Sequence, residues 1–348
     1  MTIRKLASIA EITYIKPIEG ADAIECAIVN GGWPVVVKKG EYQVNDLAIY
    51  LEIDSWVPHE LAPFLSKGQE PREYNGVKGE RLKTVKLRGQ VSQGLLLPLN
   101  TPIKGGPIDG GYEICVLGLQ GGEDVTEMLG IQKWEPPIPA QLQGTMRGNF
   151  PHFIPKTDQE RCQNLRKEFD KYQSLSYEVT EKLEGTSMTC FIYDGEFNVC
   201  SRNLNLKETE GNTYWNVARK YNIEEKLREF GYDNVAIQSE ILGPAIQNNI
   251  YGLQEHQFFV FDVYDIKNSK YFTPEQRQEF CKKLELQHAP ILESIELKNL
   301  SIENIISIAD GFSQLNNKVL REGIVFKSLC GTHHFKSISN QYLLKTKL

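Results

Sequence analysis

The chain has 348 residues, 41% of them hydrophobic and 10% aromatic, a composition typical of soluble globular proteins that predicts two or three domains. Its formal net charge of −6 excludes a general electrostatic attraction to nucleic acid, so any basic binding surface must be local. Seven cysteines without C-x-x-C spacing argue against a disulfide framework, and there is neither an apolar run of membrane-spanning length nor a signal peptide, so we expect a cytoplasmic protein.

The first hundred residues predict a series of short strands separated by glycine and proline turns. The expected strands span residues 6–15, 24–29, 33–38, 47–53, 81–87 and 94–99. A series of this kind indicates a small antiparallel barrel or sandwich, such as an OB-like barrel, rather than βαβ units.

Four basic residues gather in the strand expected at residues 81–87 and just after it, namely Arg81, Lys83, Lys86 and Arg88. Arg81 and Lys83 share one face of a strand, and Lys86 and Arg88 share the opposite face, so the cluster is not a single stripe. OB-like barrels with local positive charge commonly bind nucleic acid, which makes these four residues candidate nucleic-acid contacts. Solvated lysines that keep a sheet edge from pairing are an equally good explanation of the composition.

The segment after this barrel is rich in glycine and proline and predicts a linker. We expect one helix at residues 124–132, where Asp124 is a candidate N-cap and Glu127 stands three residues later. Residues 134–139 then predict a stiff extended connection. The expected organisation is an OB-like domain with its linker at residues 1–135 and a second domain at residues 144–348.

The second domain begins with a helix expected at residues 159–172, in which Asp158 is the candidate N-cap. Arg161 would lie in the first turn, where its charge opposes the helix dipole, so we expect an anionic partner for it. A strand at residues 176–180 enters the motif Glu181-Lys182-Leu183-Glu184-Gly185-Thr186-Ser187, and a strand at residues 187–193 leaves it. Lys182 is therefore expected in a loop between two strands of one antiparallel sheet.

The residue types of this motif suit covalent nucleotidyl transfer. The Lys182 amine can attack the α-phosphorus of a nucleoside triphosphate, Glu184 can help to place a divalent cation, and Gly185 lets the backbone approach phosphate. The amine must be unprotonated to attack, although a lysine ordinarily has a pKa of about 10.4, so desolvation or a nearby cation is required. A surface lysine at a hairpin tip is the alternative, and the motif alone does not exclude it.

Further candidate residues follow in chain order. A helix is expected at residues 222–230, a strand at 235–240 carries Glu240 at its end, and an apolar strand at 258–264 contains Phe261. A strand at 321–327 begins near Glu322 and ends in a lysine, and Lys336 and Lys345 lie close to the end of the chain. Together these residues supply a nucleophile, carboxylates for a metal, a stacking ring and phosphate-binding cations, which are the components of phosphoryl transfer.

In this order the motifs resemble those of the covalent ligase and capping-enzyme superfamily. They are most similar to ATP-dependent RNA ligases of the nick-sealing subgroup that carries an N-terminal OB domain. The resemblance implies an α+β fold, with an N-terminal OB-like β-barrel followed by a nucleotidyltransferase domain of ATP-grasp-like antiparallel sheets with flanking helices.

The resemblance also implies a role for each matching residue. Lys182 is the lysine that becomes adenylated. ATP-binding residues are Glu181, Lys182, Arg202 in Ser201-Arg202-Asn203, Glu240, Phe261 and Lys336. Phosphate-binding residues are Arg161 and Lys345, and metal-binding residues are Glu184 and Glu322. The chain departs from the family pattern at Glu184, where aspartate is usual, and at Ile338, where a second lysine is frequent; Lys345 is the candidate replacement for that lysine.

The implied activity is RNA repair with ATP and Mg²⁺ or Mn²⁺. An RNA 3′-OH end is joined to a 5′-phosphate end, at nicks in duplex, through lysyl-AMP and an adenylated 5′ end, by a protein expected to be a monomer. A capping-type guanylyltransferase, an ATP-dependent DNA ligase and a non-catalytic nucleic-acid-binding protein are the alternatives. DNA ligases and capping enzymes place an OB domain after the last motif, and the few residues beyond Lys345 favour an RNA ligase.

Overall fold

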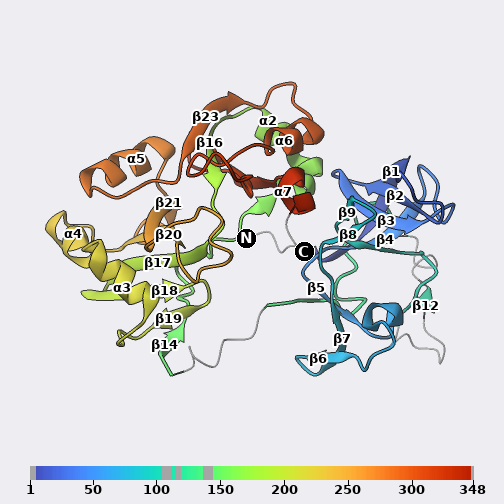
Figure 1. The fold of residues 1–348 in the computed structure, drawn as a ribbon, viewed down its shortest axis with the longest axis horizontal. Coiled ribbons are helices and arrows are strands. Elements are labelled where there is room, and N and C mark those ends of the chain that lie inside the picture. The colour runs from blue at the N-terminus through green and yellow to red at the C-terminus, as the bar shows by residue number, and fades with distance from the viewer. Residues whose placement is uncertain (1–4, 104–111, 114–118, 136–143, 346–348) are drawn as a thin grey trace. The chain divides into compact units, whose positions relative to one another are not determined.

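The computed structural model describes residues 5–103, 112–113, 119–135 and 144–345. The chain divides into two compact units, one formed by Met1–Pro137 with Leu343–Leu348 and the other by Ile138–Tyr342. Each unit is built mainly from β-strands (Figure 1). None of the described helices is both long and apolar enough to cross a lipid bilayer.

The first unit contains a five-stranded antiparallel sheet in the order β10-β4-β1-β2-β3 and a four-stranded sheet in the order β13-β5-β7-β6. The strands of the larger sheet are β1 (Ala7–Pro17), β2 (Ile24–Val29), β3 (Trp33–Lys38), β4 (Leu47–Leu51) and β10 (Leu95–Leu97). Those of the smaller sheet are β5 (Ser55–Pro58), β6 (Arg72–Tyr74), β7 (Val77–Arg81) and β13 (Gln132–Lys133). The remaining elements are β8 (Val85–Leu87), β9 (Gln90–Ser92), β11 (Pro102–Ile103), β12 (Tyr112–Glu113) and the 3₁₀ helix η1 (Pro63–Ser66).

Both faces of the larger sheet are buried, as the apolar residues of β1 show. Ala7 and Ile9 belong to one hydrophobic cluster, whereas Ala10 and Ile12 belong to another. Because alternate residues of a strand point to opposite faces, β1 contributes to a core on each side. This arrangement explains the continuous apolar character of β4.

Two predictions for the first unit are wrong. The strand expected at residues 81–87 is interrupted, because Arg81 ends β7 and β8 begins only at Val85. Leu82, between them, is buried in the core and exchanges backbone hydrogen bonds with the start of β5. The helix expected at residues 124–132 is absent; its first residue, Asp124, forms an isolated antiparallel bridge with Ser8 of β1. In both places pairing with a distant strand outweighs local preference.

The second unit contains a seven-stranded sheet, β14-β19-β18-β17-β20-β21-β22, and a five-stranded sheet, β15-β25-β24-β16-β23. The seven strands are β14 (Met146–Asn149), β17 (Thr186–Tyr193), β18 (Glu196–Ser201), β19 (Leu204–Leu206), β20 (Val235–Leu242), β21 (Gln257–Asp265) and β22 (Lys270–Tyr271). The five are β15 (Glu160–Arg161), β16 (Ser176–Lys182), β23 (Ile291–Glu296), β24 (Gly323–Ser328) and β25 (His334–Ile338). The helices are η3 (Cys162–Glu168), α2 (Phe169–Gln173), α3 (Thr213–Lys220), α4 (Ile223–Glu229), α5 (Pro274–Lys283) and α6 (Ile302–Ile308). A last helix, α7 (Asn340–Lys345), begins in this unit and ends among the residues assigned to the first.

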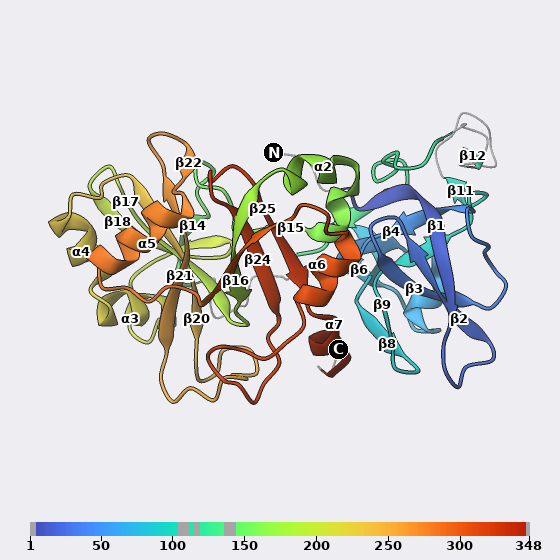
Figure 2. The ribbon, with the colours of Figure 1, turned by 90° about the horizontal axis from the view of Figure 1, so that it is seen from above.

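Each of these two sheets buries one face under helices (Figure 2). Helices α3, α4 and α5 contact β18, β17 and β21 of the seven-stranded sheet, and their apolar residues form one core with it. The five-stranded sheet packs against η3, α2 and α6, with alternate residues such as Tyr177 and Val179 of β16 pointing into that core. Glu178, Thr180 and Lys182 therefore point to the opposite face of the same sheet.

The helix expected at residues 159–172 is only partly correct, because its start and most of its helix type differ. Glu160 and Arg161 form the short strand β15, which pairs in parallel with β25, and Arg161 stands opposite Lys336. A 3₁₀ helix follows, and the α-helix begins only at Phe169. The Asp158 carboxylate does not cap a helix but forms an ion pair with Arg202. The backbone edge of β25 offers hydrogen bonds that the isolated sequence does not reveal.

Candidate active site

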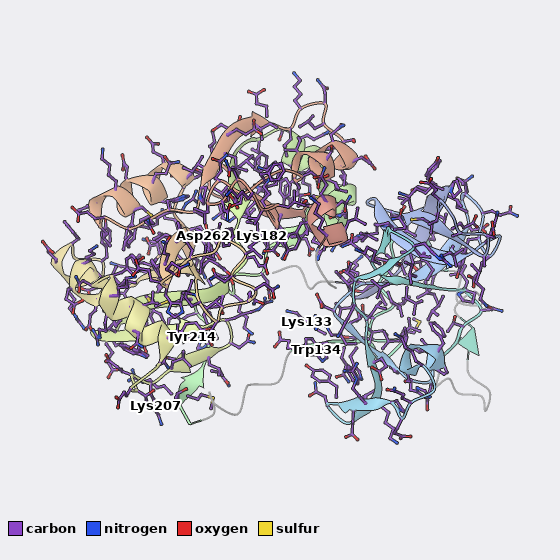
Figure 3. The ribbon with its side chains drawn as sticks, in the orientation of Figure 1. Lys133, Trp134, Lys182, Lys207, Tyr214 and Asp262 are labelled. Atoms are coloured by element: carbon purple, nitrogen blue, oxygen red, sulfur yellow. The ribbon has the colours of Figure 1, made fainter. Side chains whose placement is uncertain are left out.

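Lys182 is the last residue of β16 and stands opposite Gly323 of β24. The next strand, β17, belongs to the other sheet, so Leu183–Gly185 carry the chain from one sheet to the other. The expectation of a loop within one antiparallel sheet is therefore wrong. Lys182 instead lies at the junction of the two sheets of this unit, where both can contribute side chains (Figure 3).

Gly185 allows a close approach of backbone to backbone at this junction. A Cβ atom at Gly185 would lie 2.3 Å from the carbonyl oxygen of Ile241 and 2.8 Å from Cγ of Glu240. No side chain fits at these distances, so the sequence needs glycine here. The residue approaches β20 in this structure, whereas the sequence led us to expect an approach to phosphate.

Three rows of side chains cross one face of the five-stranded sheet. Residues that pair across strands, or lie two apart along one strand, point to the same face. The register of β16, β24 and β25 gives the rows Lys182–Gly323–Ile338, Thr180–Val325–Lys336 and Glu178–Lys327–His334. Arg161 stands beside Lys336 at the end of the second row. The predicted nucleophile Lys182 and the cations Lys336 and Arg161 are thus neighbours on one surface.

The charges around Lys182 are coupled. Its Nζ atom lies 2.6 Å from Oε2 of Glu322, and both side chains are largely shielded from solvent. Burial raises the pKa of Glu240 to about 8, an effect that the Lys182 charge opposes and the Glu322 charge reinforces. Burial, followed by the positive charges of Lys182 and Arg161, lowers the pKa of Lys336 to about 7. Perturbed pKa values of this kind cluster at functional sites.

Arg202 follows β18 and forms an ion pair with Asp158. Two further contacts attach the residues just before Asp158 near this site. The Nζ atom of Lys156 donates to Oδ1 of Asn203 at 3.0 Å, and the hydroxyls of Thr157 and Ser187 are 3.1 Å apart. The segment before β15 thus contributes to the site. The sequence analysis did not predict this role for Asp158, because it expected Asp158 to cap a helix.

The two predicted metal-binding carboxylates have different surroundings. Glu322 pairs with Lys182, whereas Oε2 of Glu184 accepts a hydrogen bond from the Tyr342 hydroxyl at 2.7 Å. Oε1 of Glu184 accepts a weaker bond from Asn248 at 3.4 Å. The spacing of the sequence motif did not reveal Tyr342 as a partner, because it lies far away in the chain.

The donor chemistry around Lys182 fits a divalent cation that is shared with a phosphate. Among the described residues no three His, Cys, Asp or Glu side chains are grouped closely enough to hold a metal ion alone. Mg²⁺ usually keeps several waters and binds through one or two carboxylates together with substrate phosphates. Glu322 and Glu240 supply hard carboxylate oxygens, and their mutual repulsion, which contributes to the raised pKa of Glu240, would be relieved by a cation.

Glu181 points to the other face of β16 from Lys182 and is buried. Its Oε2 accepts a hydrogen bond from the backbone N–H of Gln314 at 2.7 Å, whereas its Oε1 has no hydrogen-bond partner among the described residues. Burial raises the pKa of this carboxyl. A buried acceptor without a donor is costly, so a bound donor group would stabilise it.

The remaining predicted residues make other contacts. Lys345 is exposed at the end of α7, and Ile338, at the position of the missing second lysine, is buried opposite Gly323. In the first unit, Arg81 pairs with Asp54 at 2.5 Å, and its guanidinium lies 3.8 Å from the centre of the Trp134 ring. The other basic residues of that cluster, Lys83, Lys86 and Arg88, are exposed around the β8–β9 hairpin.

Comparison with known proteins finds matches for both parts of the chain. The RNA ligase family model matches residues 175–345, and an OB-fold domain model matches residues 6–99. A solved structure of a Naegleria gruberi RNA ligase mutant with AMP and Mn is 45% identical over 99% of each chain, with a TM-score of 0.84. A mutant of that ligase with ATP and Mn gives the same identity, coverage and TM-score, and the ligase with PPi gives 45%, 99% of each chain and 0.83.

No curated protein is significantly similar to the chain. The structural similarity extends over both units and confirms the expected order of an OB-like domain followed by a nucleotidyltransferase domain. With this identity over almost its whole length, the chain belongs to the RNA ligase family.

Proposed function

We propose that this RNA ligase uses ATP to seal nicks in duplex RNA, as a monomer in the cytoplasm, and that Lys182 is its nucleophile. The observation that carries the proposal is the placement of Lys182, Glu322, Glu240 and Lys336 at one junction of two sheets. The six described cysteines are free thiols, which suits a reducing compartment.

In the first step Nζ of Lys182 attacks the α-phosphorus of ATP. A phosphorus–nitrogen bond forms, the bond to the bridging oxygen breaks, and pyrophosphate leaves. Glu322, 2.6 Å from Nζ, is placed to hold a proton of the amine. Lys336, Arg161 and Arg202 are placed to bind the negative phosphate oxygens.

A divalent cation, when bound, would supply Lewis-acid stabilisation of the phosphate charge. Glu322 is the residue that would hold the cation. Glu184 would influence the cation indirectly, through its hydrogen-bond partners Tyr342 and Asn248. In the second step AMP passes from Lys182 to the 5′-phosphate of the RNA. In the third, the RNA 3′-OH attacks that phosphate and AMP leaves, which forms the phosphodiester bond.

Glu181 favours ATP over GTP in this proposal. Its buried Oε1 has no hydrogen-bond partner in the part of the chain that the structure describes, and the exocyclic amine of adenine can supply one. Guanine presents an acceptor at the corresponding position, which a carboxylate would repel. Phe261, partly exposed, is the candidate ring for stacking on the base, and Glu240 is the candidate ribose contact.

The front unit is the proposed RNA clamp. Lys83 and Arg88 are exposed and can neutralise phosphates. Lys86 is exposed too but donates a hydrogen bond to the carbonyl of Leu344, and Arg81 already pairs with Asp54 and supports the neighbouring strand. Such contacts are mostly electrostatic and weaken as the salt concentration rises. Lys345, also exposed, is a further candidate phosphate contact.

Incubation with α-labelled ATP tests the nucleophile. Lys182→Ala is expected to lose all covalent label, whereas Lys267→Ala, an exposed lysine in a loop of the same unit, keeps it. Full labelling of Lys182→Ala would remove the assignment. Labelling by GTP instead of ATP would favour a guanylyltransferase, and sealing of DNA nicks in preference to RNA nicks would favour a DNA ligase.

A further inference from the structure

Strand β21 contains one extra residue at Phe261. In its ladder with β20, Asp262 pairs with Gln238 and Val260 pairs with Ser239, so Phe261 has no partner in β20. This arrangement is a β-bulge, which leaves one residue out of the ladder and redirects its side chain. Bulges are frequent beside active sites for this reason.

The bulge changes which side chains face the helices. Val260 and Val263, three residues apart, both belong to the core beneath the helices. Phe261 instead packs against the hydrophobic cluster that includes Leu183, the neighbour of the proposed nucleophile, and Asp262 contacts Lys327 of the other sheet. In a regular strand one of these two consecutive side chains would point into the helix-covered core. The extra residue therefore lets both point toward the five-stranded sheet.

Lys327 of β24 holds the bulge from the opposite sheet. Its Nζ atom donates a hydrogen bond to the carbonyl oxygen of Phe261 and lies 2.6 Å from Oδ1 of Asp262. The same Nζ atom is 5.5 Å from the centre of the Phe261 ring, within the range of a cation–π contact. The bulge interrupts the ladder at this residue, and its carbonyl group needs a donor from elsewhere.

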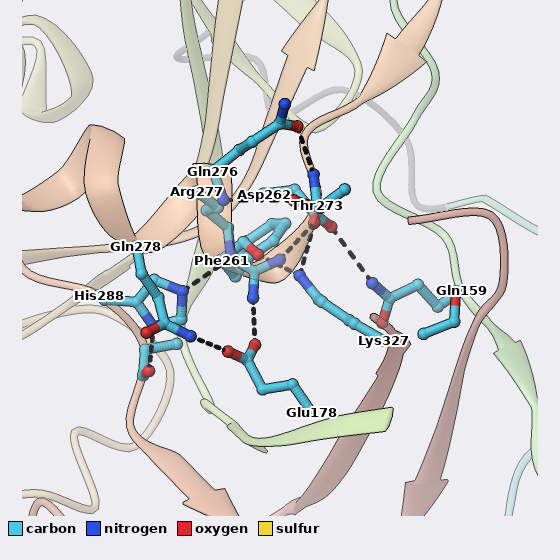
Figure 4. Close-up of polar contacts among 12 residues, drawn as sticks. Gln159, Glu178, Phe261, Asp262, Thr273, Gln276, Arg277, Gln278, His288 and Lys327 are labelled. Atoms are coloured by element: carbon cyan, nitrogen blue, oxygen red, sulfur yellow. Dashed lines mark hydrogen bonds and ion pairs between the residues drawn. The ribbon is translucent and has the colours of Figure 1, made fainter. Parts of the chain in front are cut away.

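Lys327 belongs to a buried and charge-balanced cluster (Figure 4). The side chains of Lys327, Asp262, Arg277 and Glu178 are between 0% and 4% exposed. Arg277 of α5 bonds to Glu178, lies 3.7 Å from Asp262 and donates through Nε to Nε2 of His288 at 2.7 Å. Two cations thus face two anions away from solvent.

Such a cluster is weak evidence for stability, because burying charges carries a desolvation penalty that their attraction often only offsets. The cluster has a clearer effect on the positions of the residues around it. Lys327 lies on the same strand that follows Glu322, the carboxylate paired with Lys182. The segment 322–327 therefore contacts both the proposed nucleophile, through Glu322, and the ring of Phe261, through Lys327.

We propose that Lys327 is a positioning residue for nucleotide binding. Its bond to the Phe261 carbonyl and its ion pair with Asp262 hold the bulge in place, and the bulge sets the orientation of the Phe261 ring against the adenine base. The inference rests on the proposed role of Phe261 as the stacking ring. Lys327 itself touches neither the base nor the phosphates in this account.

The deciding variant is the double substitution Lys327→Met with Asp262→Asn. Lys327→Met alone leaves a buried carboxylate without its cation and can unfold the unit, whereas the double variant removes one charge of each sign. It still lacks a donor for the Phe261 carbonyl. We therefore expect the KM for ATP in lysyl-AMP formation to rise about tenfold, with the maximal rate changed less than about threefold, because stacking of a base is lost or weakened.

Two companion variants make the result interpretable. Val263→Ala lies on the same strand but in the core beneath the helices, and we expect it to lower Tm without changing the KM for ATP. Phe261→Leu removes the ring itself, and we expect it to raise the KM at least as much as the double variant.

A wild-type KM in the double variant, with Phe261→Leu raised, would overturn the positioning role and leave the stacking role intact. An unchanged KM in Phe261→Leu would instead refute the proposed stacking role. A fall in maximal rate at constant KM would show that the cluster serves only to fold the domain.

Discussion

Arg277→Met is the substitution that most directly probes the buried cluster between the two sheets. The arginine side chain is 0% exposed, and its partner Glu178 is 2% exposed. Methionine keeps most of the length and apolar volume of the stem but removes the guanidinium. Glu178 then loses its cation, although Gln278 still donates to it, and His288 loses the donor to its Nε2 atom.

The expected loss of stability is large. Removal of one partner of a buried ion pair costs about 3–5 kcal/mol, because the other charge remains buried without compensation. A typical domain is stable by only about 5–15 kcal/mol. In a unit of this size each kcal/mol shifts Tm by about 2–4 °C, so Tm should fall by roughly 6–20 °C.

Calorimetry of the full-length protein is the assay. Lys220→Met, which removes an exposed ion pair with Glu255 in the same unit, is the control and should leave Tm unchanged within the precision of the measurement. Adding Glu178→Gln to Arg277→Met should recover part of the loss, because the uncompensated charge is gone. A fall of less than about 2 °C in Arg277→Met, or no recovery in the double variant, would contradict the reasoning.

Three further predictions concern the front unit, a histidine and a glycine. Deletion of residues 1–137 should spare labelling by ATP but weaken sealing of nicked duplex; unimpaired sealing would show that this unit is not an RNA clamp. His288 has a pKa near 3, because burial and the Arg277 charge oppose its protonation. Between pH 6.5 and 3 the unfolded chain therefore binds a proton that the folded chain does not, and stability falls as the pH falls, by at most about 1.4 kcal/mol per unit. Urea titrations give the free energy of unfolding at pH 7 and at pH 5. The difference between these two free energies should be smaller in His288→Gln than in the native protein, and equal differences would exclude this histidine as the cause. Gly185→Ala should distort the turn after Lys182, because its Cβ would lie 2.3 Å from the Ile241 carbonyl oxygen, so that labelling by ATP drops at least tenfold; wild-type labelling would show that the turn can adapt.

Local patterns in the sequence predicted many elements well. The strands at 24–29 and 33–38 have the predicted bounds. Alternation of apolar and polar residues, turn residues and chain order are all local information. The order of the motifs was also sufficient to identify the family, because it depends on residue types and not on their contacts.

Other features depended on partners that are distant in the chain. The sequence at 159–172 has helical character, but the free edge of β25 draws Arg161 into a strand. Arg81 looked like a nucleic-acid contact, yet Asp54 and Trp134 engage it. Neither outcome can be read from a local window, because the competing hydrogen bonds and charges come from residues tens to hundreds of positions away.

In the candidate active site, too, some features follow from local sequence and others depend on residues distant in the chain. By itself the sequence predicted which side chains are candidates for the chemistry, but it placed Lys182 in a loop and not at the end of β16. Only the tertiary structure decided that β16 and β17 lie in different sheets, that Phe261 occupies a bulge, and that Lys327 reaches it from the other sheet. The physical reason is that side-chain periodicity encodes which face of a strand is buried, whereas the pairing of strands and buried charges is settled by the free energy of contacts across the whole unit.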